Sequence, residues 1–237
     1  KGYAADDAVT VAFGTNASIQ TTVASQYGSF TTSFTVDVQR YGTTTITASG
    51  VGSATNVFSI CPQVVSVVPP AGTVGTVVTI SGTGYAAGDN ITVAFGTNAS
   101  IQTALAGQHG SFTANFTVDV QAYGTTTITS IGVSAATNVF SIQPQVVSVQ
   151  PTQGSVGTIV TIYSTGYAAS DTVKVSFGTN ASIQTAVAGQ HGSFTANFTV
   201  DVQRYGTTTI TASGVGSATN VFSIQPQVVS VVPSAGT

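Results

Sequence analysis

Hydrophobic and polar residues alternate along short stretches of this chain. The clearest case is residues 111–120, SFTANFTVDV, where every second side chain is apolar: Phe112, Ala114, Phe116, Val118 and Val120. A period of two with one polar face is typical of a half-buried β-strand. Residues 90–95, NITVAF, show the same alternation. Both segments are therefore predicted to be strands that bury one face.

The same pattern predicts seven short strands within one stretch of the chain, at residues 64–68, 74–82, 90–95, 100–105, 111–120, 125–131 and 137–142. In the segment 100–105, Ile101 and Leu105 are expected on one side of the strand. Glycine, proline, asparagine or aspartate separates the segments, as expected for turns. No apolar stripe of helical period is present. We therefore predict an all-β fold made of immunoglobulin-like β-sandwich domains.

The strand pattern occurs three times along the chain. The sequence FGTNASIQ stands at 13–20, 95–102 and 177–184, a step of 82 residues each time. This period suits a small β-sandwich and is too long for one turn of a solenoid. We predict one repeat at 1–62 that lacks its first strands, complete repeats at 63–144 and 145–226, and at 227–237 the first strand of a further repeat or a donor strand.

The phase of the repeat leaves both ends incomplete. Lys1 aligns with Thr83, and Thr237 aligns with Thr73, so the counterparts of residues 74–82 are absent from both ends. We expect either a window on a longer covalent array or a subunit completed by its neighbours. In the second case the segment 227–237 adds a strand to the next copy, and this head-to-tail contact propagates as an open filament.

Residues 64–96, VVSVVPPAGTVGTVVTISGTGYAAGDNITVAFG, resemble the opening of the IPT/TIG-like immunoglobulin-fold domains of prokaryotic surface proteins. The shared features are a proline turn, a Gly-Thr-Val-Val-Thr-Ile strand, a Gly-Thr-Gly-Tyr corner and a strand that ends in Phe-Gly. The resemblance implies an extracellular or cell-surface location. It spans surface arrays, adhesins, filament stalks and non-catalytic modules of secreted enzymes, so it implies no single activity.

Composition excludes several classes of partner. Only 5% of the residues are charged, and the formal net charge is −3. So few basic residues argue against nucleic-acid binding and against recognition of anionic lipids. The longest apolar candidate, residues 56–80, is interrupted by Ser, Gln, Pro, Gly and Thr, which argues against a membrane span in this segment.

No set of residues predicts catalysis. His109 and His191 stand in GQHG turns, and the spacing places no serine and carboxylate with them. The aspartates lie too far apart for a dense calcium loop, although calcium at the domain junctions stays open as an alternative. We therefore expect no catalytic, cofactor-binding or metal-binding residues. The single cysteine, Cys61, excludes a disulfide within the chain and is a candidate for an intermolecular one.

Glycosylation sequons are frequent. Six asparagines have the N-x-S/T pattern: Asn16, Asn98 and Asn180 in NAS, Asn115 and Asn197 in NFT, and Asn90 in NIT. The alternation places Asn115 and Asn197 on the outward face. A chain rich in serine and threonine also generates such patterns by chance, so these asparagines are candidates only.

A domain repeated with little change provides length and a regularly spaced surface. The junction at 138–149 contains one proline and no flexible glycine or serine linker. The leading hypothesis is an extracellular structural protein, the shaft of a filament, a stalk or a surface array, with further copies of itself as partners. The alternative is an adhesin whose repeats project or bind glycans through tyrosines. A third hypothesis is a spacer array in a secreted enzyme.

Overall fold

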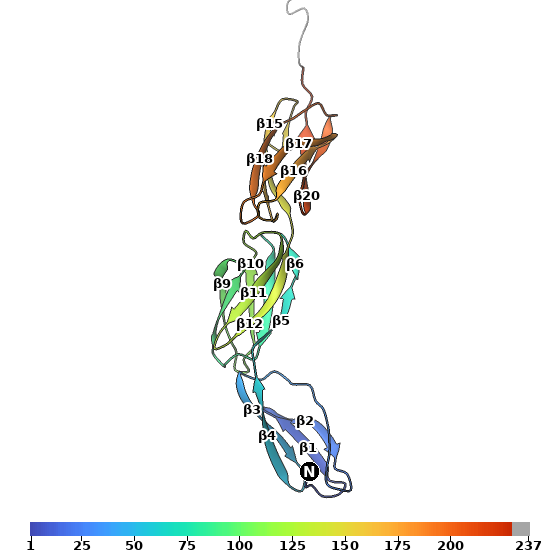
Figure 1. The fold of residues 1–237 in the computed structure, drawn as a ribbon, viewed down its shortest axis with the longest axis vertical. Coiled ribbons are helices and arrows are strands. Elements are labelled where there is room, and N and C mark those ends of the chain that lie inside the picture. The colour runs from blue at the N-terminus through green and yellow to red at the C-terminus, as the bar shows by residue number, and fades with distance from the viewer. Residues whose placement is uncertain (229–237) are drawn as a thin grey trace, which may run out of the picture. The chain divides into compact units, whose positions relative to one another are not determined.

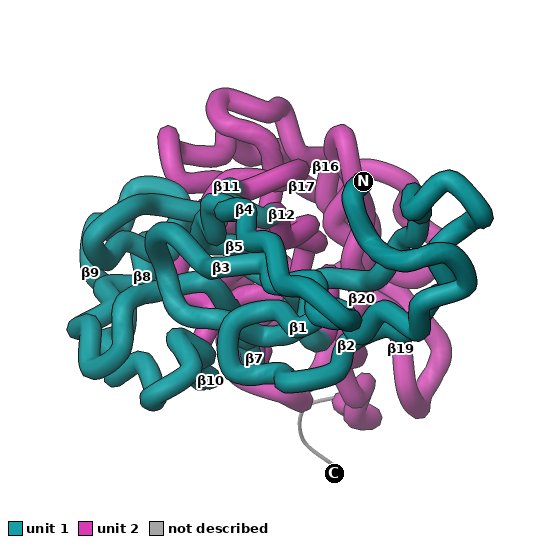
Figure 2. The backbone as a smooth tube through the Cα atoms, turned by 90° about the horizontal axis from the view of Figure 1, so that it is seen from below, with its two compact units in different colours: residues 1–68, 79–116, 127–138 teal, residues 69–78, 117–126, 139–237 magenta. Residues whose placement is uncertain are grey.

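The computed structural model describes residues 1–228 and leaves residues 229–237 outside the description. Every regular element among the described residues is a β-strand (Figure 1), so none of these residues forms a helix that could span a membrane. The chain divides into two compact units (Figure 2). The first contains Lys1–Val68, Thr79–Phe116 and Thr127–Asn138, and the second contains Pro69–Val78, Thr117–Thr126 and Val139–Thr237. Both units therefore include strands of the middle repeat.

The first repeat forms a single sheet. Its strands are β1 (Ala8–Phe13), β2 (Asn16–Val23), β3 (Gly42–Ser49) and β4 (Ser53–Ile60), in the order β2-β1-β3-β4. All three adjacent pairs are antiparallel. Strand β4 ends this sheet on one side.

The middle repeat forms two sheets. Its strands are β5 (Gln63–Val68), β6 (Ala71–Gly72), β7 (Val77–Thr83), β8 (Asn90–Phe95), β9 (Asn98–Leu105), β10 (Phe112–Thr117), β11 (Gly124–Ile131) and β12 (Ala135–Ile142). One sheet has the order β10-β7-β5 and the other β6-β12-β11-β8-β9.

The third repeat has the same arrangement. Its strands are β13 (Gln145–Gln150), β14 (Gln153–Gly154), β15 (Ile159–Thr165), β16 (Thr172–Phe177), β17 (Asn180–Val187), β18 (Phe194–Thr199), β19 (Gly206–Ser213) and β20 (Ser217–Ile224). Its sheets are β13-β15-β18 and β14-β20-β19-β16-β17. The core between them contains paired aromatic rings, with Phe177 and Phe198 at 5.2 Å between ring centroids.

This topology confirms the predicted immunoglobulin-like sandwich. Leaving aside the two-residue strands β6 and β14, the first, second and fifth strands of a complete repeat form one sheet and the remaining four form the other. Strand β6 pairs in parallel with the end of β12, so the segment that follows β5 crosses from one sheet to the other. Strand β14 pairs with β20 in the same way.

The alternation correctly predicted β10. Its burial alternates strictly, and Phe112, Ala114 and Phe116 are all buried. Strand β9 shows no such alternation of burial, and Leu105 is 70% exposed. Strand β9 lies at the edge of its sheet, and the register with β8 shifts between Val93 and Phe95. An edge strand packs against fewer neighbours, and a bulge interrupts the alternation of buried positions.

The first repeat lacks one of the two sheets. Residues 30–35, FTTSFT, correspond to β10 and to β18, yet they form no strand. In the third repeat, β18 is paired along its whole length with β15. The counterpart of β15 is not part of the first repeat, so residues 30–35 have no adjacent strand to complete their backbone hydrogen bonds. Among the described residues, β1 is therefore the first strand of this repeat.

Candidate functional site

The joints between repeats use the same hydrogen bond twice. The backbone N–H of Tyr41 donates to the carbonyl oxygen of Tyr85 at 2.8 Å, and the N–H of Tyr123 donates to that of Tyr167 at 2.9 Å. Each donor lies just before the second-last strand of its repeat, β3 or β11, and each acceptor lies in the Gly-Tyr corner of the next repeat. The two bonds are 82 residues apart, so the joint repeats with the sequence.

Each acceptor carbonyl is held in place by its own buried side chain. Tyr167 is fully buried, and its hydroxyl donates to the carbonyl oxygen of Ala212 at 3.0 Å. Its ring packs edge-on against Phe194, with 5.2 Å between centroids. Tyr85 is equally buried, and its hydroxyl bonds to Ser130. The acceptor of each joint therefore sits on a rigid part of the core.

A hollow of about 550 Å³ lies beside the first joint. The first repeat contributes Gly14, Thr15, Gln39, Arg40 and Thr43–Thr45, and the middle repeat contributes Ala87, Gln108 and His109. The third repeat has a hollow of about 750 Å³ formed by the corresponding residues Gly178, Thr179, Gln203, Arg204 and Thr207–Thr209, together with Val202 and Tyr205. No described residue of a following repeat lines this second hollow.

The exposed fraction of the tyrosine is smaller where a following repeat packs against it. Tyr41 is 43% exposed and Tyr123 is 40% exposed, whereas the corresponding Tyr205 is 75% exposed. The difference arises because Tyr41 and Tyr123 each face a following repeat. The corresponding end of the third repeat, which we call the Tyr205 surface (Gly178, Thr179, Gln203, Arg204 and Tyr205), is thus not covered by another repeat within residues 1–228.

The repeated FGTN sequence has a structural role at this surface. In the first repeat, the side-chain amide of Asn16 donates to Asp37 at 3.1 Å, and Gln39 donates to the same carboxylate at 2.7 Å. In the third repeat, Asn180 and Gln203 both donate to Asp201 at 2.8 Å. One carboxylate thus joins the FGTN turn to the segment that leads into the joint.

The six sequon asparagines fall into two groups. Asn16 and Asn180 are half-buried and bonded to aspartate, and Asn98 occupies the same half-buried position. Asn90, Asn115 and Asn197 are exposed. The outward orientation expected for Asn115 and Asn197 is confirmed, because both lie at exposed positions of the alternating strands β10 and β18.

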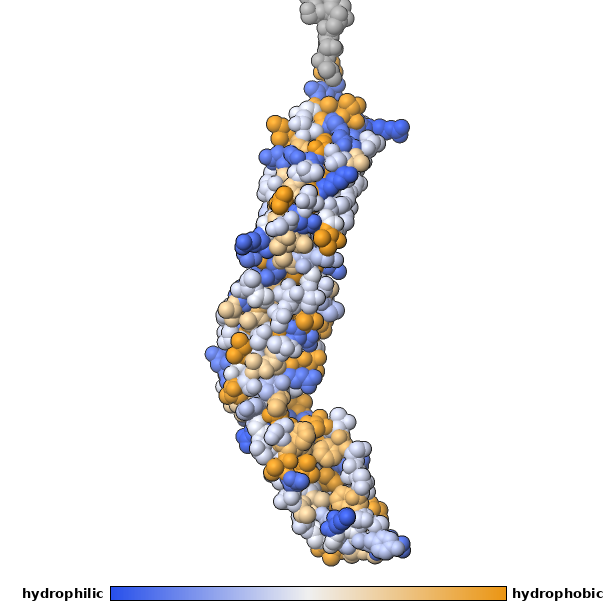
Figure 3. Space-filling view, viewed as in Figure 1, coloured by the Kyte–Doolittle hydropathy of each residue, from blue (hydrophilic) through white to orange (hydrophobic). Residues whose placement is uncertain are grey.

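The open face of the first repeat exposes side chains that are buried elsewhere. Phe58 on β4 is 44% exposed, whereas Phe140 and Phe222 at the same position are 0% and 1% exposed. Val36 is 43% exposed, whereas Val118 is 1% exposed. Figure 3 shows apolar atoms gathered over the first repeat. An uncovered apolar surface of this kind is typical of a contact site.

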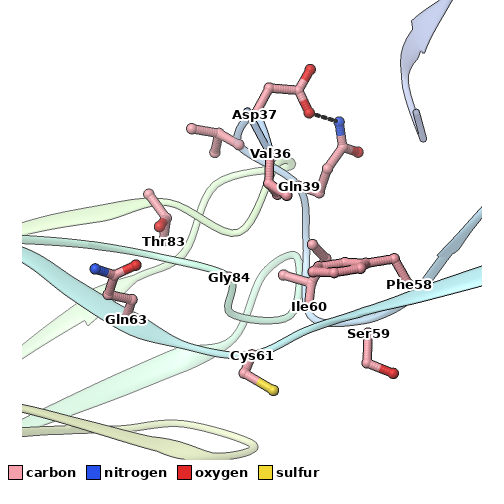
Figure 4. A pocket seen from close by; sticks show the side chains of 11 residues that line it. Val36, Asp37, Gln39, Phe58, Ser59, Ile60, Cys61, Gln63, Thr83 and Gly84 are labelled. Carbon is pink, nitrogen blue, oxygen red and sulfur yellow. Dashed lines mark hydrogen bonds between the residues drawn. The ribbon is translucent and has the colours of Figure 1, made fainter. Parts of the chain in front are cut away.

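A hollow of about 370 Å³ opens on this face, lined by residues including Val36, Val38, Phe58, Ile60 and Cys61. Figure 4 shows that Phe58 and Ile60 point to one side of β4, toward Val36, while Ser59 and Cys61 point to the other. Cys61 is exposed and has no disulfide partner in this chain. The structure therefore leaves its thiol accessible at the end of β4.

Three aspartates bind the backbone of hairpins. Asp7, Asp89 and Asp171 each accept a hydrogen bond from the backbone of the hairpin that joins the last two strands of their repeat, at 2.8, 2.8 and 2.7 Å. His109 lines the hollow at the first joint. Within residues 1–228, no three of the His, Cys, Asp and Glu side chains lie close enough to hold a metal ion.

The burial of Tyr167 makes the stability of the third repeat sensitive to high pH. Its desolvation, together with the nearby charge of Asp171, raises the pKa of Tyr167 to about 12. The unfolded chain loses this proton near pH 10, whereas the folded chain keeps it up to about pH 12. The contribution of this proton to the free energy of unfolding is therefore fully present below pH 10. As the pH rises from 10 to 12, the free energy of unfolding falls by about 3 kcal/mol.

Urea denaturation followed by circular dichroism at several pH values measures this loss. The control is Tyr167→Phe, which is less stable at neutral pH but lacks the titrating hydroxyl. Its stability should fall less between pH 10 and 12 than that of the parent chain. Equal slopes for the two proteins would contradict the assignment to Tyr167.

The topology and the joints define a class: the chain is a tandem array of immunoglobulin-like β-sandwich repeats, of which the first is incomplete in the described residues. No known protein-family profile matches it, and no curated protein sequence matches it. The resemblance to IPT/TIG-like domains thus remains a resemblance.

Solved structures share a distant likeness. The adhesin InvE of Yersinia pseudotuberculosis aligns over 70% of this chain and 58% of its own, with 11% identity and a TM-score of 0.31. Red sea bream transglutaminase aligns over 71% and 31%, with 9% identity and 0.30. SGBP-B from a mixed-linkage glucan utilization locus of Bacteroides ovatus aligns over 94% and 64%, with 12% identity and 0.28. The chain spans less than two thirds of each. These scores support no inference about function.

Sequence reasoning missed the joint. The signal was present, because RYG, AYG and RYG recur at 40–42, 122–124 and 204–206 in register with the Gly-Tyr corners. The sequence offers these tyrosines only as candidates for glycan binding. That a backbone N–H of one repeat meets a carbonyl of the next depends on three-dimensional placement, which the sequence pattern does not show.

Proposed function

We propose that this chain is an extracellular structural protein whose repeats form the shaft of a filament, a stalk or a surface array, without catalysis. Copies associate head to tail. The observation that carries this proposal is the joint made twice with the same hydrogen bond, Tyr41 to Tyr85 and Tyr123 to Tyr167, and left uncovered at Tyr205. A repeated joint gives successive repeats the same contact, which a regular array requires.

The surfaces at the two ends of the chain correspond to the two sides of a joint. The Tyr205 surface corresponds to the surface that receives the middle repeat, and the exposed end of the first repeat carries Tyr3 and Tyr27 at the positions of Tyr85 and His109. Tyr27 is 84% exposed. A contact between these two different surfaces is heterologous, so it extends without closing.

The adhesin alternative has less support from the tyrosines. Tyr85 and Tyr167 are fully buried and bonded through their hydroxyls, and Tyr41 and Tyr123 lie in joints. Stacking on a sugar requires an exposed ring face. Of Tyr41, Tyr85, Tyr123, Tyr167 and Tyr205, the last is the most exposed, and it belongs to the proposed assembly surface.

Sedimentation velocity and negative-stain electron microscopy of the 237-residue chain test the proposal. We expect open, concentration-dependent polymers. Tyr205→Pro removes the backbone donor of the uncovered joint and should weaken association several-fold, since one hydrogen bond is worth about 0.5–1.5 kcal/mol. Tyr205→Phe keeps that donor and should assemble like the parent. A chain that stays monomeric at all concentrations, with native melting behaviour, would contradict head-to-tail assembly.

The glycan proposal concerns the exposed sequons. Attached sugars would keep the surface hydrated in a chain of which only 5% of the residues are charged. We expect modification at Asn115 and Asn197 before Asn16 and Asn180, whose amide groups are already bonded to carboxylates. Glycopeptide mass spectrometry of native material measures the occupancy of each site. Unmodified Asn115 and Asn197 peptides would rule the idea out.

A further inference from the structure

We propose that the free edge of β4 in the first repeat binds Gln227–Thr237 of a second copy of this chain. This inference rests on the proposed head-to-tail assembly and names the segment that makes the contact. The sequence predicts that residues 227–237 form the first strand of a further repeat or a donor strand, and residues 229–237 lie outside the described part of the chain. The complete repeats show which contacts such a segment makes.

In both complete repeats, the last strand donates three hydrogen bonds to the segment that opens the repeat. In the middle repeat, the side-chain amide of Asn138 donates to Val64 O at 3.3 Å, Ser141 N donates to Pro70 O at 3.0 Å, and Gln143 N donates to Gly72 O at 2.8 Å.

The three corresponding hydrogen bonds of the third repeat have nearly the same lengths. Asn220 donates to Val146 O at 3.2 Å. Ser223 N donates to Thr152 O at 3.0 Å, and Gln225 N donates to Gly154 O at 2.8 Å. In both complete repeats, the opening segment is thus held against the last strand by the same three hydrogen bonds.

The first repeat carries the corresponding three donors: Asn56 and Ser59 on β4, and Cys61 directly after its end. Strand β4 is the last strand of its sheet, and no described strand covers its other edge, where β12 and β20 each carry a short parallel strand. An uncovered strand edge is a template for another chain. The donor pattern is therefore present without its acceptor segment.

The segment 227–237 supplies the matching acceptors. Its sequence, QVVSVVPSAGT, equals that of residues 63–73 except that Ser234 stands in place of Pro70. The acceptors would be the carbonyl oxygens of Val228, Ser234 and Gly236, which correspond to those of Val64, Pro70 and Gly72. All three bonds reach β4, so none of them depends on the counterpart of β7.

Apolar burial favours the same pairing. Val228 is 82% exposed, whereas Val64 and Val146 at the same position are each 5% exposed. On the other side of the contact, Phe58 is 44% exposed and its counterparts are buried. Each surface therefore exposes side chains that the other would cover, and burial of apolar area at about 25 cal/mol per Å² adds to the hydrogen bonds.

The native Cys61 provides a direct test. In the complete repeats the parallel register pairs Ile142 with Gly72, so the next pair along is Gln143 with Thr73. The corresponding pair between two copies is Cys61 with Thr237. Adjacent strands lie about 4.8 Å apart, which is within the range that a disulfide spans. We expect Thr237→Cys under mild oxidation to give a ladder of disulfide-linked oligomers on non-reducing gels.

Three controls define the outcome. The parent chain has one cysteine and can form at most a disulfide-linked dimer. Thr237→Cys with Cys61→Ser has again one thiol and should give no ladder. Val51→Cys places the new thiol on the exposed hairpin before β4, at the opposite end of that strand from Cys61, and should give far less ladder. A cross-linked monomer, or no ladder from a chain that still polymerises, overturns this inference and leaves head-to-tail assembly standing. A monomeric chain overturns both.

A second measurement does not depend on oxidation. The peptide 227–237, carrying a fluorophore, should bind the chain 1–226 in an anisotropy titration. Phe58→Asp on the open face should weaken binding at least tenfold, and Val57→Asp, the neighbour on the opposite side of β4, should not. If Phe58→Asp fails to fold, Val36→Asp takes its place. Equal binding by the open-face variant and the control overturns the proposal.

Discussion

Replacing Phe222 with alanine should lower the free energy of unfolding of the third repeat by about 3–5 kcal/mol, whereas Phe58→Ala should cost the first repeat less than half as much. The two phenylalanines occupy the same position of the repeat. Phe222 is 1% exposed and packs against Phe177 at 5.8 Å between centroids, and Phe58 is 44% exposed and packs against Phe13 at 5.9 Å. The difference between the two losses of unfolding free energy therefore measures how much burial the second sheet gives this phenylalanine.

Hydrogen exchange with mass spectrometry resolves the two repeats, because each peptide reports the opening free energy of its own region. The control is Val57→Ala against Val221→Ala, a pair of exposed valines at one position of the repeat. Both should change stability by less than about 0.5 kcal/mol. Equal costs for Phe58→Ala and Phe222→Ala in the monomeric chain would contradict the open face. In assembled material the cost of Phe58→Ala should rise if the tail of another copy covers it.

Gly192→Ala should destabilise the third repeat by about 3 kcal/mol or more, because two penalties add. Gly192 has φ of +73°, a conformation that alanine adopts only with strain, and a Cβ there would stand 2.0 Å from the carbonyl oxygen of Tyr167. Gly192 also accepts the hydrogen bond from Tyr167 N at 3.0 Å. The substitution must displace the backbone that forms the joint acceptor.

Gly189, in the same turn, is the matched control. A Cβ at Gly189 would meet Ser193 O at 3.5 Å, an ordinary contact, so Gly189→Ala should change stability by less than about 1 kcal/mol. Thermal and urea denaturation compare the two variants. Exchange of the Tyr123 amide should also quicken in Gly192→Ala, since Tyr123 N donates to the displaced carbonyl. A Gly192→Ala variant as stable as Gly189→Ala would show that the turn can rearrange freely.

The structure also shows how local identity can give different conformations. Residues 30–35 and 112–117 differ at two positions, FTTSFT against FTANFT, yet only the second forms a strand. Local sequence cannot explain this difference, because the two segments have the same alternation and nearly the same β-propensity. The adjacent strand decides it, since a strand is stable only when its backbone groups are paired.

The sequence by itself determined the repeat, the strands and the sandwich, because alternation with a period of two and turn residues at regular spacing act locally. Strands β10 and β18, and the outward position of Asn115 and Asn197, could be predicted in this way. The tertiary structure alone decided which identical residues are buried: Phe222 lies in a core and Phe58 on an open face. It also decided that Leu105 is exposed and that Tyr41 meets Tyr85. Burial and backbone contacts between repeats depend on which segment lies opposite, and a local pattern carries no information about an absent neighbour.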